Sequence, residues 1–239
     1  MRLLAILALF LFTLSVTGGE KKTPLRVCLI SGAAEYDTDK TLPILQKHLE
    51  AKLGAACTLL SAKGDSDLPG LEALEKCDAA ILFTRRLKLQ GEQLERIKKY
   101  CTAGKPLVGL RTASHGIQTW LDIDHAVFGG NYKNHHKVGP LCEIKIANGA
   151  SDHPILRGFK TFKSEGSLYR NTGLATDVTI LLTGSIPEAT EPIAWTRVVN
   201  GGRVFYTSLG HQKDFEEPSF LRLISNAVLW TTKRESEIK

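Results

Sequence analysis

The sequence has 239 residues, a formal net charge of +6, and 43% hydrophobic and 23% charged residues. This composition is that of an ordinary globular chain, and it excludes wholesale disorder, a collagen-like repeat and a protein with several membrane spans. Basic and acidic residues are intermixed along the chain, without a basic stripe interleaved with aromatic residues. We therefore expect no nucleic-acid partner.

The N-terminal segment differs from this average. Arg2 is its only charge, an apolar run from Leu3 to Leu14 follows, and small or polar residues lead to Gly19. This order is typical of a secretory signal peptide, and about 12 apolar residues fall short of the roughly 20 that span a bilayer. We expect residues 1–19 to be a signal peptide and residues 20–239 to form a secreted or periplasmic domain with no membrane span after its removal.

Five cysteines follow this segment: Cys28, Cys57, Cys77, Cys101 and Cys142. Their spacing fits no zinc-binding pattern, and their odd number leaves at least one of them unpaired. An oxidising compartment permits disulfides, but Cys28 and Cys142 lie within apolar stretches. We expect buried, unreactive thiols.

Strand-like and helical patterns alternate through the first half of the chain. Residues 25–31 form the apolar run of a strand covered on both faces, and leucines with helical spacing follow over residues 42–53. Two further strands are expected over 57–61 and 78–83, with a short helical stretch between them. A helix over 90–101 and a strand over 106–110 come next. This alternation predicts a doubly wound parallel α/β sheet.

The second half contains strand-like segments joined by short loops, and a helix closes the chain. The strands are expected over 141–146, 178–183, 192–197 and 203–208, and the helix over 216–228. Neither a low-complexity linker nor an internal repeat divides the chain. The sequence therefore predicts a single α/β domain with a mainly parallel sheet.

Histidines gather where such a sheet holds its ligands, beyond the carboxyl ends of its strands. His115 follows the strand 106–110, together with Arg111, and His211 follows the strand 203–208. His135 and His136 lie between them in the glycine-containing segment FGGNYKNHH. We expect these four imidazoles to lie at one edge of the sheet.

The cluster has two functional interpretations. His135, His136 and His211 could bind zinc or another divalent metal, with Glu165 completing the set. Alternatively, His115, His136 and His211 act directly as general acid and base, because imidazole titrates nearest to neutral pH. No HExxH or similar spacing decides between them, so the cofactor stays open. Separate structural roles for each histidine are the third alternative.

Several motifs resemble the ThuA-like trehalose-utilisation family over about residues 25–232. They are GLRTASHGIQTW (109–120), VFGGNYKNHH (127–136), EGSLY (165–169), PIAWTR (192–197) and GRVFYTSLGH (202–211). The resemblance implies a flavodoxin-like sheet with helices on both faces, similar to class I glutamine amidotransferases. Those enzymes carry a nucleophilic Cys at the turn where this chain has Arg111, and a His at the place of His211. An arginine cannot replace a thiolate, so a Cys-dependent amidotransferase is not expected.

The resemblance also implies a role in carbohydrate metabolism, with a glycoside or keto-sugar as the small-molecule substrate. Arg111 could hold an anionic or carbonyl oxygen of that substrate. The aromatic rings of Tyr132, Tyr169 and Trp120 could contact a sugar ring, and Gly129 and Gly130 could allow close backbone approach.

These residues are compatible with a two-carboxylate glycosidase, with a histidine-centred enzyme, or with a non-catalytic binding module. A two-carboxylate glycosidase would need a second acid beside Glu165, and the loop after the first strand offers Glu35, Asp37 and Asp39 without selecting one. We therefore favour an exported enzyme of hydrolase or lyase type with a histidine-centred site. The alternative is a non-catalytic carbohydrate-binding or metabolite-binding module that has lost the nucleophile.

Overall fold

The computed structural model describes residues 23–239, so the predicted signal peptide lies outside the described residues. In the first half, β1 (Arg26–Gly32), β2 (Ala56–Ser61), β3 (Ala79–Thr84) and β4 (Leu107–Leu110) alternate with α1 (Thr38–Leu53), a 3₁₀ turn (Leu71–Glu75) and α2 (Gly91–Thr102). In the second half, β5 (Cys142–Ile146), β6 (Lys163–Ser164), β7 (Thr179–Ile186), β8 (Ala189–Val199) and β9 (Gly202–Thr207) precede α3 (Pro218–Thr231). Every strand and helix expected from the sequence is present.

These strands form one nine-stranded sheet in the order β2-β1-β3-β4-β9-β8-β7-β5-β6. The five strands from β2 to β9 are parallel, whereas β8, β7, β5 and β6 pair antiparallel with their neighbours. The α/β class is therefore confirmed, but a doubly wound parallel sheet describes only one half of the molecule. The connections β7–β8 and β8–β9 are tight turns, which are too short for the crossover that parallel pairing requires.

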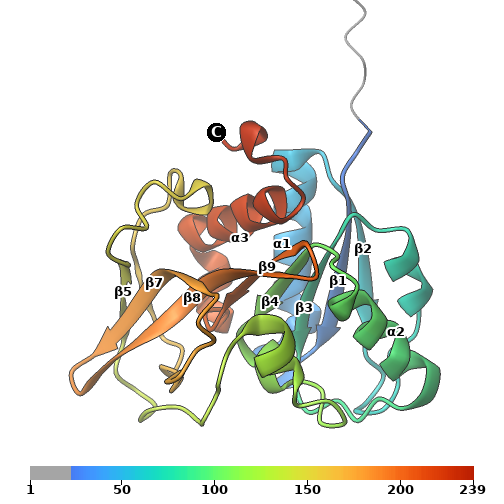
Figure 1. Ribbon diagram of the computed structural model, residues 1–239, viewed down its shortest axis with the longest axis horizontal. Coiled ribbons are helices and arrows are strands. Elements are labelled where there is room, and N and C mark those ends of the chain that lie inside the picture. The colour runs from blue at the N-terminus through green and yellow to red at the C-terminus, as the bar shows by residue number, and fades with distance from the viewer. Residues whose placement is uncertain (1–22) are drawn as a thin grey trace, which may run out of the picture.

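Apolar periodicity explains how the helices cover the parallel half. All six residues of β3 are buried, as expected of a central strand covered on both faces. On one face, leucines of α1 pack in a common core with Phe220 and Leu223 of α3. On the other face, Ile97 and Tyr100 of α2 pack against the sheet. Figure 1 shows α1 and α3 side by side and α2 on the opposite side of the parallel strands.

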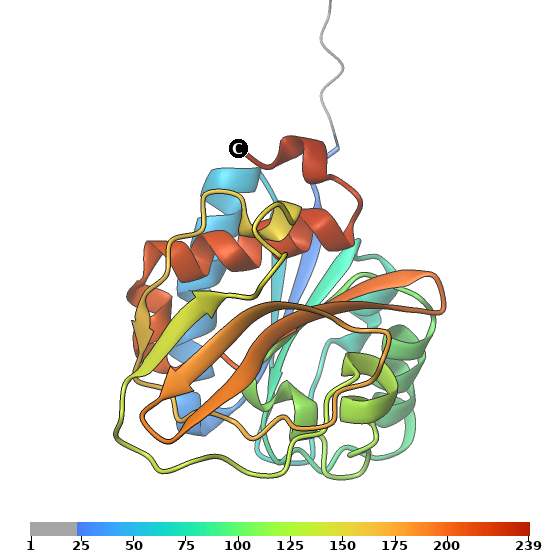
Figure 2. The same cartoon turned by 60° about the vertical axis from the view of Figure 1, so that its left-hand side comes forward.

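The antiparallel strands extend the sheet beyond β9, and Figure 2 brings them forward. The apolar core continues beneath them, because Ile144, Leu182 and Ala194 belong to the same buried cluster as α1 and α3. Both halves therefore share one core on that face. Within residues 23–239, no helix is both long and apolar enough to cross a bilayer.

All five cysteines are free thiols. Cys28, Cys101 and Cys142 are buried, and burial raises the pKa of Cys101 to about 12. Cys77 is only partly buried, and a hydrogen bond with the Cys28 thiol lowers its pKa. The prediction of buried thiols is therefore confirmed for Cys28, Cys101 and Cys142 and wrong for Cys57 and Cys77, which are partly buried.

Candidate functional site

A cleft of about 500 Å³ lies at the carboxyl ends of the parallel strands. The segments after β1, β3, β4 and β9 contribute to it, and two loops of the antiparallel half complete it. Its charged and aromatic lining residues are Glu35, Tyr36, Arg85, Arg86, Arg111, His115, Tyr132, His135, Glu165, Tyr169 and His211. The predicted sheet edge therefore carries a cleft, and most of the predicted site residues line it.

Arg111 occupies the sharp turn after β4. Its φ of 47° is left-handed, and its side chain is buried with 2% exposure. Nη1 donates to the Ser208 carbonyl oxygen at 2.7 Å, and Nη2 donates to the Ser167 hydroxyl oxygen at 3.1 Å. The guanidinium carbon lies 4.9 Å from the Tyr36 ring centre and 4.8 Å from that of Tyr169. Arg111 thus joins three segments at the base of the cleft.

His115 ends the 3₁₀ helix that follows this turn. Its ring stacks on Tyr132 with the centroids 3.9 Å apart and the planes 9° from parallel. Nδ1 lies 3.0 Å from the Ser114 hydroxyl, with which it shares a hydrogen bond. Because Nδ1 is engaged in this way, Nε2 is the ring nitrogen left for a ligand.

Burial and nearby cations together determine the charge of His115. Burial is the largest of the causes that lower the pKa of this imidazole, the positive charges of Arg85, Arg111 and Arg86 follow in that order, and together these effects bring the pKa to about 4. His115 is therefore neutral at neutral pH. A neutral imidazole can accept a proton, which is the state required of a general base.

His135 and His211 reach the cleft from two other segments. Nδ1 of His135 donates to the His136 carbonyl oxygen at 2.7 Å, because a carbonyl oxygen can only accept. The side chain of His211 accepts a long hydrogen bond of 3.4 Å from the Lys213 N–H. These contacts leave Nε2 of each ring for a ligand.

His136 points away from this cleft. Its Nε2 lies 2.9 Å from Glu191 Oε1, and the Glu191 side chain is itself only 8% exposed. Residues 133–136 form a short ladder with residues 168–170, and successive side chains of an extended segment point to opposite sides. Adjacent histidines on such a segment cannot both face one site.

The structure does not bring the three predicted metal ligands together. His135 and His211 line the cleft, but His136 makes a hydrogen bond to Glu191 outside it. No group of three or more His, Cys, Asp or Glu side chains in the described part of the chain has an arrangement that could hold a metal ion. His136 therefore lies apart from the other predicted catalytic and metal-binding residues, which line the cleft.

Three predicted substrate contacts have packing roles and do not line the cleft. A Cβ at Gly129 would come 2.8 Å from Val178, and its φ of 69° favours glycine. A Cβ at Gly130 would clash with the Asp124 carboxylate, 2.1 Å from its Oδ1. Trp120 packs partly buried against the core on the α2 side. Tyr132, Tyr169 and Glu165 do line the cleft, and Glu165 is exposed.

Sequence reasoning missed the cleft residues that follow β1 and β3. Arg85 and Arg86 come directly after β3, and Tyr36 follows β1. Gln212 donates to the Glu35 carbonyl oxygen at 2.9 Å and so connects the segments after β9 and β1. The rule that identified Arg111 and His211, applied to every predicted parallel strand, would have found them.

Asp214 is a further missed residue, located beneath His211. One carboxylate oxygen accepts from the N–H groups of Gly210 and His211 at 2.8 and 3.0 Å, and the other accepts from the Ser164 hydroxyl at 2.7 Å. Burial raises the pKa of this carboxyl. Asp214 thus holds the backbone that presents His211.

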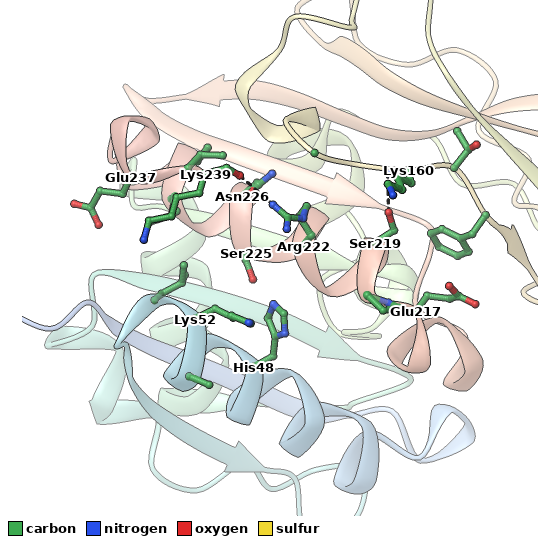
Figure 3. Close-up of a pocket in the computed structure, with 18 residues that line it drawn as sticks. His48, Lys52, Lys160, Glu217, Ser219, Arg222, Ser225, Asn226, Glu237 and Lys239 are labelled. Atoms are coloured by element: carbon green, nitrogen blue, oxygen red, sulfur yellow. Dashed lines mark hydrogen bonds between the residues drawn. The ribbon is translucent and has the colours of Figure 1, made fainter.

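A larger hollow of about 840 Å³ lies on the helical side of the molecule, between α1, α3 and the loop that carries Lys160. Figure 3 shows His48 and Lys52 projecting from α1 and Arg222 from α3. The buried polar groups there already have partners: Asn226 donates to two carbonyl oxygens and Ser225 to a third. None of the residues singled out from the sequence as catalytic or substrate-binding lines it, so the smaller cleft is the candidate site.

Comparisons with known proteins show the family and the fold of the chain. The family model ThuA, described as trehalose utilisation, matches residues 26–231. No curated protein matches the sequence significantly. A ThuA-like protein from Bacteroides uniformis is 16% identical, with a TM-score of 0.66 over 90% of this chain and 94% of that one.

Two further solved structures share the fold. A ThuA-like protein from Parabacteroides merdae is 15% identical, with a TM-score of 0.65 over 88% of this chain and 90% of that one. A glutamine amidotransferase from Thermotoga maritima is 10% identical, with a TM-score of 0.54 over 88% of this chain and 99% of that one. The overall fold is therefore common to both groups.

Proposed function

Because the chain belongs to the ThuA (trehalose utilisation) family, we propose that it is a carbohydrate-acting enzyme whose cleft binds a glycoside or keto-sugar. The observation that carries the proposal is the neutral imidazole of His115, stacked on Tyr132 and bordered by arginines. The stacked rings offer an apolar surface for a sugar ring, and the polar side chains around them offer hydrogen bonds.

The proposed role of His115 is that of general base. In a keto-glycoside whose carbonyl lies two carbons from the glycosidic carbon, the hydrogen on the intervening carbon is acidic. Nε2 of His115 takes this proton, the C–H electron pair becomes a carbon–carbon double bond, and the glycosidic C–O bond breaks. The departing oxygen receives a proton from Nε2 of His211, the ring nitrogen that carries the proton because Nδ1 accepts the Lys213 N–H. Positive charge near the carbonyl oxygen stabilises the enolate that develops during this step.

The test uses a purified keto-glycoside and trehalose, which has no carbonyl. We expect the wild-type protein to release the leaving alcohol from the keto-glycoside only, as followed by NMR. His115→Gln should lower kcat about 100-fold, which is a typical loss for a general base. The matched control is His125→Gln, because His125 is exposed and does not line the cleft. Equal activity of His115→Gln and wild type would contradict the proposal.

The second candidate function is a non-catalytic binding module. Arg111 favours it, because this residue occupies the elbow turn and directs both Nη groups to hydrogen bonds within the protein. The same experiment separates the two functions. Calorimetric binding of the keto-glycoside without any product after a long incubation supports the module, whereas release of product supports the enzyme.

We also propose that the protein is exported. The support is the charge, apolar and small-residue order of residues 1–19. The mass of the protein recovered from its native cells checks this proposal, because signal removal shortens the chain at about Gly19.

A further inference from the structure

We infer that the ligand of the cleft carries an anionic oxygen group, either a carboxylate or a phosphate, and that Arg86 at the rim is its main contact. This inference rests on the proposed function, because it adds a charged group to the sugar that the cleft is proposed to bind. Three observations support it: the charge inventory, the conformation of Arg86 and the buried donors beneath the cleft.

Three arginines line the cleft, and Arg86 is the one whose guanidinium is available to bind a ligand. Arg85 forms an ion pair with Glu35 across the rim. Arg111 is buried between two tyrosine rings and donates to protein oxygens. Among the described residues, no carboxylate forms an ion pair with Arg86, and its side chain is exposed.

Glu165 is the one lining carboxylate without an ion pair among the described residues, so its influence must be weighed. Its side chain is exposed. Three arginines, Arg85, Arg86 and Arg111, line the same cleft, against the two carboxylates Glu35 and Glu165. The permanently charged groups of the lining therefore leave an excess of positive charge.

The backbone conformation of Arg86 is the second observation. Its φ of 57° is left-handed, a conformation that costs free energy in a residue with a side chain. Both backbone polar groups of the next residue, Leu87, are hydrogen-bonded. Its N–H donates to the Gly116 carbonyl oxygen at 2.8 Å, and its carbonyl oxygen accepts the Gln118 N–H at 2.7 Å. The turn is thus held in place and presents Arg86 at the rim.

Unsatisfied polar groups beneath the cleft are the third observation. Arg111 Nε and Thr112 Oγ1 are buried and have no hydrogen-bond partner within the described residues. Both residues line the cleft. Guanidinium N–H groups only donate, so this part of the cleft has a shortage of acceptor oxygens, which an anionic group supplies.

The test is calorimetric titration with three matched probes: glucose, glucuronate and glucose 6-phosphate. We expect at least one of the two anions to bind about tenfold tighter than glucose, which corresponds to about 1.4 kcal/mol. The tighter anion identifies the group as a carboxylate or a phosphate. Equal affinities for all three probes would overturn the inference and leave the proposed sugar chemistry intact.

Variants of Arg86 make the test specific to this residue. Arg86→Gln should abolish the tenfold preference for the anion, and Arg86→Lys should retain part of it because it keeps the charge. Lys88→Gln is the control, because Lys88 is near in sequence but pairs with Asp65 outside the cleft. An undiminished preference in Arg86→Gln would overturn the assignment of Arg86.

An NMR titration of His115 gives a readout that does not depend on turnover. Binding of an anion beside this imidazole should raise its pKa by about one unit, toward the ordinary value. An unchanged pKa at saturating anion would overturn the inference. Failure of the proposed function has a different signature: the anion binds and shifts His115, but the keto-glycoside is not consumed.

Discussion

Asp124 is a buried carboxyl that fixes the position of a cleft residue. Its Oδ2 accepts the Tyr132 N–H at 2.7 Å, whereas its Oδ1 has no hydrogen-bond partner among the described residues. Burial raises the pKa of this group to about 6 from an ordinary value of 3.8. The carboxyl of Asp124 is therefore protonated at a higher pH in the native state than in the unfolded chain. Because Asp124 holds the backbone of Tyr132, and Tyr132 stacks on His115, the charge of Asp124 affects the position of both rings.

The first prediction at this scale concerns the pH dependence of stability. Because the pKa of Asp124 is higher in the native state than in the unfolded chain, this carboxyl contributes to the free energy of unfolding. The contribution is fully present below about pH 4 and is lost as the pH rises through about 6. A shift of two units corresponds to about 3 kcal/mol. Asp124→Asn removes this contribution, so the variant should be less pH-dependent than the wild type between pH 4.5 and pH 7.5. Urea denaturation at both pH values measures the difference, and identical pH dependence in the two proteins would contradict the prediction.

The cleft loop, residues 129–141, is the element that closes the site on the antiparallel side. Its backbone pairs with the segment before β7: the Lys133 N–H donates to Arg170, the Arg170 N–H to Asn134, and the His136 N–H to Leu168. The hydrogen bond between His136 Nε2 and Glu191 of β8 then holds the loop on the side away from the cleft. The loop therefore depends on a histidine that does not touch the ligand.

The prediction at the scale of this element is a loosening of the loop in His136→Ala. Removal of the imidazole leaves Glu191 Oε1 buried without its partner, which costs about 1–3 kcal/mol. Limited proteolysis should cut within residues 129–141 faster than in the wild type, and affinity for the cleft ligand should fall several-fold. His135→Ala changes the same loop but keeps the hydrogen bond between His136 and Glu191, so its proteolysis rate should stay near that of the wild type. Equal protection in His136→Ala and His135→Ala would disprove this role.

At the scale of the whole molecule, the strands and helices could be predicted because their signals are local. A continuous apolar run such as β3, or a leucine stripe such as that of α1, depends only on nearby residues. Strand direction was not predicted in the second half, because it depends on pairing between distant segments. The side-chain direction of His136 was missed for the same reason, since its extended conformation comes from pairing with residues 168–170.

The candidate site could be predicted in part. Arg111 and His211 were identified because each directly follows a recognisable strand, whereas Arg85 and Arg86 were missed although they follow β3 in the same way. The lowered pKa of His115 could not be predicted from the sequence, because it depends on burial and on arginines that follow two different strands. The positions of residues relative to the predicted strands thus indicated which edge of the sheet carries the site. They did not indicate the charge of the side chains at that site.

The shared core predicts cooperative unfolding. Val108 of the parallel half and Leu182 of the antiparallel half belong to one buried cluster, and Trp195 of β8 donates to the Phe128 carbonyl oxygen at 2.7 Å. Tryptophan fluorescence and far-UV circular dichroism should therefore report the same urea midpoint. Two separate midpoints would show that the halves unfold independently.

Arg111 has a consequence for protein engineering. Its side chain joins the turn after β4 to the backbone after β9 and to the loop at Ser167. Arg111→Cys would place a thiol at this turn but would also leave the Ser208 carbonyl oxygen without this donor and open a gap between Tyr36 and Tyr169. Installing an active-site thiol here would thus need compensating changes on the other two segments, so a single codon change does not convert this scaffold into a thiol hydrolase.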